Sequence, residues 1–126
     1  MADRANERGR IFKRFGVEEV PDASCGTILA FAPESPAYEW EGITVIAYKL
    51  DEQERHAQTY FAEMREFSQG LLANVLGVMG RPRRDWVALF AQLPPGSYEL
   101  VLNGPVRKLA GAMVYPGRIV QVTFAS

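Results

Sequence analysis

Histidine and cysteine are almost absent from this chain, which has one of each, His56 and Cys25. A single cysteine excludes a disulfide within the chain. A zinc site needs several cysteine or histidine ligands, and a serine or cysteine hydrolase needs a histidine beside its nucleophile. Any such centre would have to use His56, whose sequence neighbours are polar. We therefore expect no metal, no cofactor and no enzymatic activity.

The chain also lacks an excess of charge of either sign. It has 14 Lys and Arg against 15 Asp and Glu, a net charge of −1. Nucleic acids and anionic membranes are recognised through strongly basic surfaces, so nucleic acid is not an expected partner and a membrane is disfavoured. No apolar run reaches the about 20 residues that span a bilayer, and the charged N-terminus MADRANERGRIFKRF has no signal-like apolar segment. These absences predict a cytoplasmic protein.

Alternating apolar and polar residues occupy most of what remains. The 126 residues, of which 48% are hydrophobic, suit one domain with a substantial core. Alternation with a period of two predicts strands, because successive side chains of a strand point to opposite faces. The expected strands cover residues 26–32, 42–50, 85–92, 97–103, 109–114 and 118–125. The second of these is apolar on both faces, which predicts a central strand.

The turn at residues 93–100, LPPGSYEL, is the most informative stretch. Pro94 and Pro95 fix φ and cannot donate to a sheet, and Gly96 supplies the backbone freedom of a tight turn. The strand after the turn places Tyr98, Leu100 and Leu102 on one face. Val101 breaks the alternation because it is apolar on the opposite face. This pattern predicts an antiparallel β-sandwich and indicates no reaction.

The segment from Val87 to Leu102, VALFAQLPPGSYELVL, resembles the turn of carboxypeptidase regulatory-like domains. These belong with the transthyretin-like (prealbumin-like) and collagen-adhesin B-type sandwiches. Residues 26–28 followed by 42–48 are similar to the opening strands of these domains, and residues 115–124 to their last turn and strand. The resemblance covers residues 25–126 and implies a mainly β, antiparallel, transthyretin-like or Ig-like sandwich. It is nearly silent on function.

Residues 51–80 depart from that pattern, because these domains normally have one short strand there. Apolar residues recur at spacings of three and four, which predicts an amphipathic helix over about 52–80. The acidic residues Asp51, Glu52 and Glu54 suit its N-terminus. The buried stripe would contain Tyr60, Met64, Phe67, Leu71 and Val75. A strand over residues 55–61 is the competing interpretation, because the alternation there also fits.

Residues 1–22 are interpreted as an arm outside the sandwich, which would occupy residues 23–126. Ile11, Phe12 and Phe15 lie among three cations in this arm, and a compact basic cluster follows the expected helix. Both features, and the apolar end of the helix, suit contact with another protein. The residues expected to bind a partner are Ile11, Phe12, Phe15, Leu72, Leu76, Met79, Arg81, Arg83 and Arg84.

Two functions fit these observations. The leading hypothesis is a non-catalytic interaction or scaffold subunit of a larger assembly, bound to a protein partner or to a second copy. The alternative is a small ligand-binding module, of carbohydrate type, in which Tyr38, Trp40 and Trp86 stack on sugar rings.

Overall fold

The fold is described from a computed structural model in which residues 13, 24–33, 40–67, 85–104 and 107–125 are placed. The predicted arm, residues 1–22, lies outside these residues except for Lys13. Residues 68–84, which include most of the predicted helix and the basic cluster, also lie outside them.

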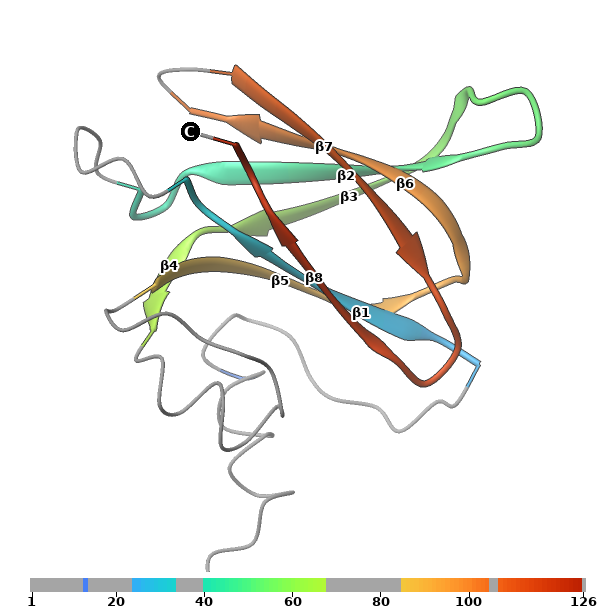
Figure 1. The fold of residues 1–126 in the computed structure, drawn as a ribbon, viewed down its shortest axis with the longest axis horizontal. Coiled ribbons are helices and arrows are strands. Elements are labelled where there is room, and N and C mark those ends of the chain that lie inside the picture. Colours follow the sequence, from blue (N-terminus) through green and yellow to red (C-terminus); the bar gives the residue numbers. More distant parts are fainter. Residues whose placement is uncertain (1–12, 14–23, 34–39, 68–84, 105–106, 126) are drawn as a thin grey trace, which may run out of the picture.

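Eight strands form two four-stranded sheets (Figure 1). The strands are β1 (Gly26–Phe31), β2 (Thr44–Leu50), β3 (His56–Glu63), β4 (Arg65–Phe67), β5 (Asp85–Leu93), β6 (Gly96–Asn103), β7 (Arg107–Val114) and β8 (Ile119–Thr123). Sheet A has the order β4-β5-β1-β8 and sheet B the order β3-β2-β6-β7. All neighbours are antiparallel except β1 and β8, which are parallel.

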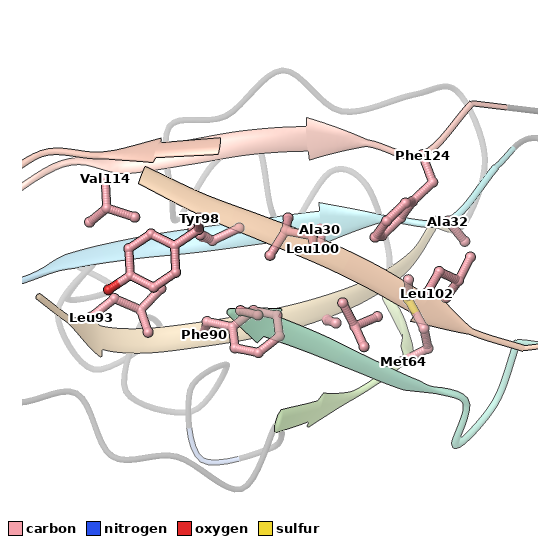
Figure 2. Packing of buried hydrophobic residues seen from close by; sticks show 14 of the residues in the cluster. Ala30, Ala32, Met64, Phe90, Leu93, Tyr98, Leu100, Leu102, Val114 and Phe124 are labelled. Atoms are coloured by element: carbon pink, nitrogen blue, oxygen red, sulfur yellow. The ribbon is translucent and has the colours of Figure 1, made fainter. Parts of the chain in front are cut away.

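The two sheets share one hydrophobic core (Figure 2). Sheet A contributes Ile28, Ala30 and Phe90, and sheet B contributes Val45, Leu100 and Leu102 among others. In sheet A the alternate residues that face away from this core are buried as well: Leu29, Phe31, Val87 and Leu89. Sheet A is therefore covered on both faces over the middle of β1 and β5.

The predicted mainly β class is confirmed, and each strand predicted from alternation is present with its ends shifted by a few residues. Residues 42–50 were expected to be a central strand, and β2 lies between β3 and β6. The inward face predicted for residues 97–103 is also confirmed, because Tyr98, Leu100 and Leu102 are all buried in the core.

The predicted helix is wrong where the structure can test it. Residues 56–63 form β3 and residues 65–67 form β4, so the competing interpretation of a strand was the right one. Tyr60, Ala62 and Met64 share the inward face at a spacing of two, and Phe61 points outward. β2 pairs with β3 along its whole length, and these long-range hydrogen bonds outweigh the local helical pattern.

Asp51 holds the turn between β2 and β3 and does not begin a helix. Its Oδ1 accepts hydrogen bonds from the backbone N–H groups of Gln53 and Arg55, both at 2.9 Å, and its Oδ2 lies 3.1 Å from Arg55 Nε. Glu54 takes a positive φ of 59° in this turn. Side-chain acceptors of this kind stabilise turns by replacing backbone partners. The acidic residues that suggested a helix start therefore mark a hairpin.

The turn at residues 94–96 carries the chain from sheet A to sheet B. Tyr98, 2% exposed, inserts its ring into the core, and its hydroxyl donates to the carbonyl oxygen of Pro94 at 2.5 Å. This is the arrangement of a tyrosine corner, in which a buried Tyr bonds to backbone a few residues upstream. Gly96 has φ of 145°, a conformation that strains other residues. Burial raises the pKa of Tyr98 well above its usual range, so the hydroxyl remains a donor.

We expect Tyr98→Ala to lower the free energy of unfolding by about 3–5 kcal/mol, because it removes a buried aromatic ring. Tyr98→Phe keeps the ring and loses only the bond to Pro94, which costs about 1 kcal/mol. Denaturant unfolding followed by circular dichroism measures both values. Equal losses for the two variants would contradict the assignment of most of the stabilisation to the ring.

We also expect the stabilising effect of Asp51 to depend on pH. The hydrogen bond from the Arg55 backbone, followed by that from Gln53, lowers the pKa of Asp51 below its ordinary value of 3.8. The folded state therefore gains stability above pH 3.8, and this gain disappears as the pH falls through the lower, folded pKa. Asp51→Ala should have a lower Tm than the native chain at pH 7, and the difference should shrink in acid. A difference that is unchanged in acid would contradict the role of the charge.

Gly26, in β1 of sheet A, and Gly111, in β7 of sheet B, should respond differently to alanine. A Cβ on Gly26 would lie 2.5 Å from Val114 Cγ1 and 2.6 Å from the Tyr115 carbonyl oxygen, because the β7–β8 turn docks there. Gly26→Ala should cost about 1–3 kcal/mol of stability through overpacking. Gly111→Ala, where the nearest heavy atom is Tyr98 O at 4.0 Å, should not destabilise the fold. Thermal unfolding compares them, and equal losses would contradict the packing argument.

Candidate functional site

An apolar row crosses the outer face of sheet B, the face turned away from the core. Ile46 of β2 lies opposite Phe61 of β3 on one side and Val101 of β6 on the other. Val101 in turn lies opposite Leu109 of β7. The apolar row is defined as these four residues, one from each strand of the sheet: Phe61, Ile46, Val101 and Leu109.

Both ends of the apolar row are open to solvent. The Phe61 residue is 68% exposed and Leu109 is 59% exposed, whereas Val101 in the middle is only 3% exposed. Val101 is covered because it sits on an inner strand between larger neighbours. An apolar strip that ends in two exposed side chains is unfavourable in water and is a surface that association would cover.

Polar residues border the apolar row on both sides. On one side the register places Glu63, Thr44, Asn103 and Arg107 across the four strands. On the other side it places Thr59, Tyr48, Glu99 and Gly111. An apolar centre with a polar rim is the usual arrangement of protein–protein interfaces.

His56 lies on this outer face, next to the polar border. A register shift between Lys49 and Leu50 places His56 opposite Leu50, and its ring stacks on Tyr48 with centroids 3.9 Å apart and an interplanar angle of 9°. His56 Nε2 lies 3.2 Å from Glu99 Oε1. His56 falls within the range predicted to be a helix, 52–80, and the structure places it at the start of β3 instead. The stack and the carboxylate bring the imidazole of β3 against side chains of β2 and β6.

The structure places two of the three aromatic residues that were predicted to stack on a carbohydrate ligand, Trp40 and Trp86. Trp40 is only 2% exposed and belongs to the core, where it packs beside Gly104 and Ile43. Trp86 is half-buried and also packs against the core. Tyr38 lies outside the described residues. Trp40 was therefore a wrong candidate for sugar stacking, because its side chain fills the interior.

None of the residues predicted to bind a protein partner can be placed. Ile11, Phe12 and Phe15 of the arm lie outside the described residues, and so do Leu72, Leu76, Met79, Arg81, Arg83 and Arg84. Only part of the predicted buried stripe lies within the described residues. Met64 is fully buried and Tyr60 packs against the core, whereas Leu71 and Val75 lie outside the described residues.

Sequence reasoning missed the apolar row, although two of its residues carried a signal. Val101 interrupted the alternation of its strand, and Ile46 made its strand apolar on both faces. Phe61 was assigned to a helix, so its place at the end of the row depended on a strand pairing that no local pattern fixes. Leu109 was placed in a strand, but its register against β6 was unknown.

Comparison with known proteins identifies no relative. No family model, no curated protein and no solved structure matches the chain significantly. In the part of the chain that is described, no three of its His, Cys, Asp and Glu residues are grouped so as to hold a metal ion. The described residues likewise contain no helix of the length and apolar character that crossing a bilayer requires.

Proposed function

We propose that this protein is a non-catalytic interaction or scaffold subunit of a larger assembly, and that it binds protein through the outer face of sheet B. The observation that carries this proposal is the apolar row, whose two end residues, Phe61 and Leu109, are exposed while both are anchored in a regular sheet. Because these residues are held in a regular sheet, binding need not order the backbone that carries them.

The energetics favour a protein as the occupant of this face. Burying apolar surface contributes about 25 cal/mol per Å², so covering a Phe and a Leu side chain contributes a few kcal/mol. Aromatic residues at the centre of an interface supply most of its binding energy, and a charged rim adds specificity. Glu63, whose carboxylate lies 3.0 Å from the Arg65 guanidinium, and Arg107 lie at opposite ends of one border of the row.

We further propose that the chain is a carboxypeptidase regulatory-like, transthyretin-like sandwich. The Leu-Pro-Pro-Gly-x-Tyr motif lies between two strands, β5 and β6, as it does in the domains that it resembles. Its tyrosine serves packing, because Tyr98 fills the core and bonds to Pro94. Because the motif residues stabilise the fold, the function of such a domain is expected to depend on its surface residues. The burial of Trp40 speaks against the carbohydrate-binding alternative.

The double variant Phe61→Ser with Leu109→Ser tests the proposed function. The tagged chain, isolated gently from the cells that make it, should carry a protein at fixed stoichiometry, measured by native mass spectrometry. The double variant should lose that protein, because removing two interface anchors worth about 2 kcal/mol each weakens binding by several hundredfold. The control is Thr123→Ser, an exposed residue of β8 in sheet A, away from the outer face of sheet B.

Both variants should unfold near the native denaturant midpoint, since exposed substitutions usually change stability by less than about 0.5 kcal/mol. A native chain that is recovered as a monomer with no stoichiometric protein would overturn the proposal. Retention of the protein by the folded double variant would assign the interface to another surface.

A further inference from the structure

Strand β7 is a long and regular edge of sheet B. It pairs with β6 through eight consecutive residues without a register shift, and no other strand in the described residues is hydrogen-bonded to it. Its two cations, Arg107 and Lys108, are confined to its first two positions. Proteins usually protect an exposed edge with charged side chains, a bulge, a proline or a short strand. In β7 the charges stop at Lys108, and the six residues 109–114 have none of these devices.

Exposed apolar side chains concentrate along this edge. Three of the four exposed large hydrophobic residues among those described lie on β7 or directly after it: Leu109, Met113 at 43% exposure and Tyr115 at 56%. Leu109 and Met113 share the outer face, because residues of β7 alternate between exposed and half-buried. Gly111 lies midway between them on the same face.

The packing of this chain does not require glycine at position 111. A Cβ there would meet only the Tyr98 carbonyl oxygen, at 4.0 Å, whereas a Cβ on Gly26 would collide with its neighbours. Gly111 also lacks the positive φ that favours glycine at Gly42, Gly96 and Gly117. A glycine inside a strand weakens it, and it often marks a place where another backbone or a large side chain approaches closely.

We propose that two copies of this chain pair antiparallel through β7, about a twofold axis at Gly111. This inference rests on the proposed function and names a second copy as one partner. With Gly111 on the axis, Leu109 lies opposite Met113 of the second copy, and Met113 lies opposite Leu109. The four side chains flank the two glycines, and the open space above Gly111 receives them.

The positions of these residues favour a second copy over an unrelated strand. The two exposed apolar residues are equidistant from Gly111, so the edge is complementary to itself, as a twofold interface requires. The same register places Ala110 opposite Ala112 on the inner face and Arg107 opposite Tyr115, a suitable cation–π pair. The net charge of −1 opposes association only weakly.

The other edges are less suited to self-pairing. β3 has a register shift near its start, at Lys49 and Leu50 of its neighbour, and such irregularities interrupt edge pairing. The edges of sheet A are shorter, because β4 has three residues and β8 has five. Pairing through β7 would join the two B sheets into one sheet of eight strands, and the apolar row of each copy would end against Met113 of the other.

Cysteine crosslinking tests the position of the axis. Residues directly opposite in antiparallel strands have Cα atoms about 4.5–5.5 Å apart, which a disulfide can bridge. In a Cys25→Ser background, Gly111→Cys should form a disulfide-linked dimer under mild oxidation. The matched control is Thr59→Cys, on the exposed part of β3, the other long edge of the same sheet. It should remain monomeric on a non-reducing gel.

Charge substitution tests the register without cysteine. The variant Leu109→Lys with Met113→Lys places like charges opposite each other and should sediment as a monomer. The variant Leu109→Lys with Met113→Glu places a cation opposite a carboxylate of the second copy, so dimerisation should be restored. The two positions are about 13 Å apart along one strand, too far to pair within a chain.

Analytical ultracentrifugation of the purified full chain is expected to show a dimer. A monomer throughout the accessible concentration range, or a dimer that crosslinks through Thr59→Cys and not through Gly111→Cys, would overturn this inference. Neither result touches the proposed function, because Phe61 lies on β3, at the opposite edge of sheet B, and Phe61→Ser alone tests the binding of a native protein there. A monomer that also carries no protein from its native cells would overturn both the proposed function and the proposed dimer.

Discussion

The hydrogen bond from Tyr98 to the carbonyl of Pro94 fixes the place where the chain passes from one sheet to the other. β5 ends in sheet A, and β6 begins in sheet B three residues later. The ring of Tyr98 lies in the shared core, so the same residue closes the turn and fills the space between the sheets (Figure 2). Once this crossing is fixed, the residues of β6 that face the core are fixed too. Strands β2 and β7 pair with β6, so their inward-facing residues follow from it.

The outer face of sheet B follows from that register. Period-two alternation leaves Val101 on the outside of β6 as soon as Tyr98, Leu100 and Leu102 point inward. The pairing of β6 with β2 and β7 then brings Ile46 and Leu109 beside Val101. The apolar row is thus a consequence of strand pairing, although its residues are separated widely in the sequence.

Local patterns in the sequence predicted most of the fold and little of the candidate site. Alternation and the proline-rich turn were enough for the strands around Tyr98, because each is a local property. The secondary structure of the segment that holds Tyr60, Phe61 and Met64 was predicted wrongly, because its apolar spacing fits both a helix and a strand. The long-range pairing with β2 decided between them. Trp40 was misjudged for the same reason, since burial depends on contacts such as that with Gly104.

The two ends of the apolar row have different surroundings, which bears on how an assembly could grow. Leu109 lies on β7, so a second copy paired there would cover it together with Met113. Phe61 lies on β3, at the opposite edge of the sheet, and would stay exposed in each copy. Neighbouring strands are about 4.8 Å apart, so an eight-stranded sheet would carry its two Phe61 ends about 34 Å apart. Such a dimer would be bivalent toward a further partner, and bivalence increases avidity without new contacts. A scaffold subunit would gain from such bivalence, and self-pairing through β7, with Gly111 at its centre, would supply it.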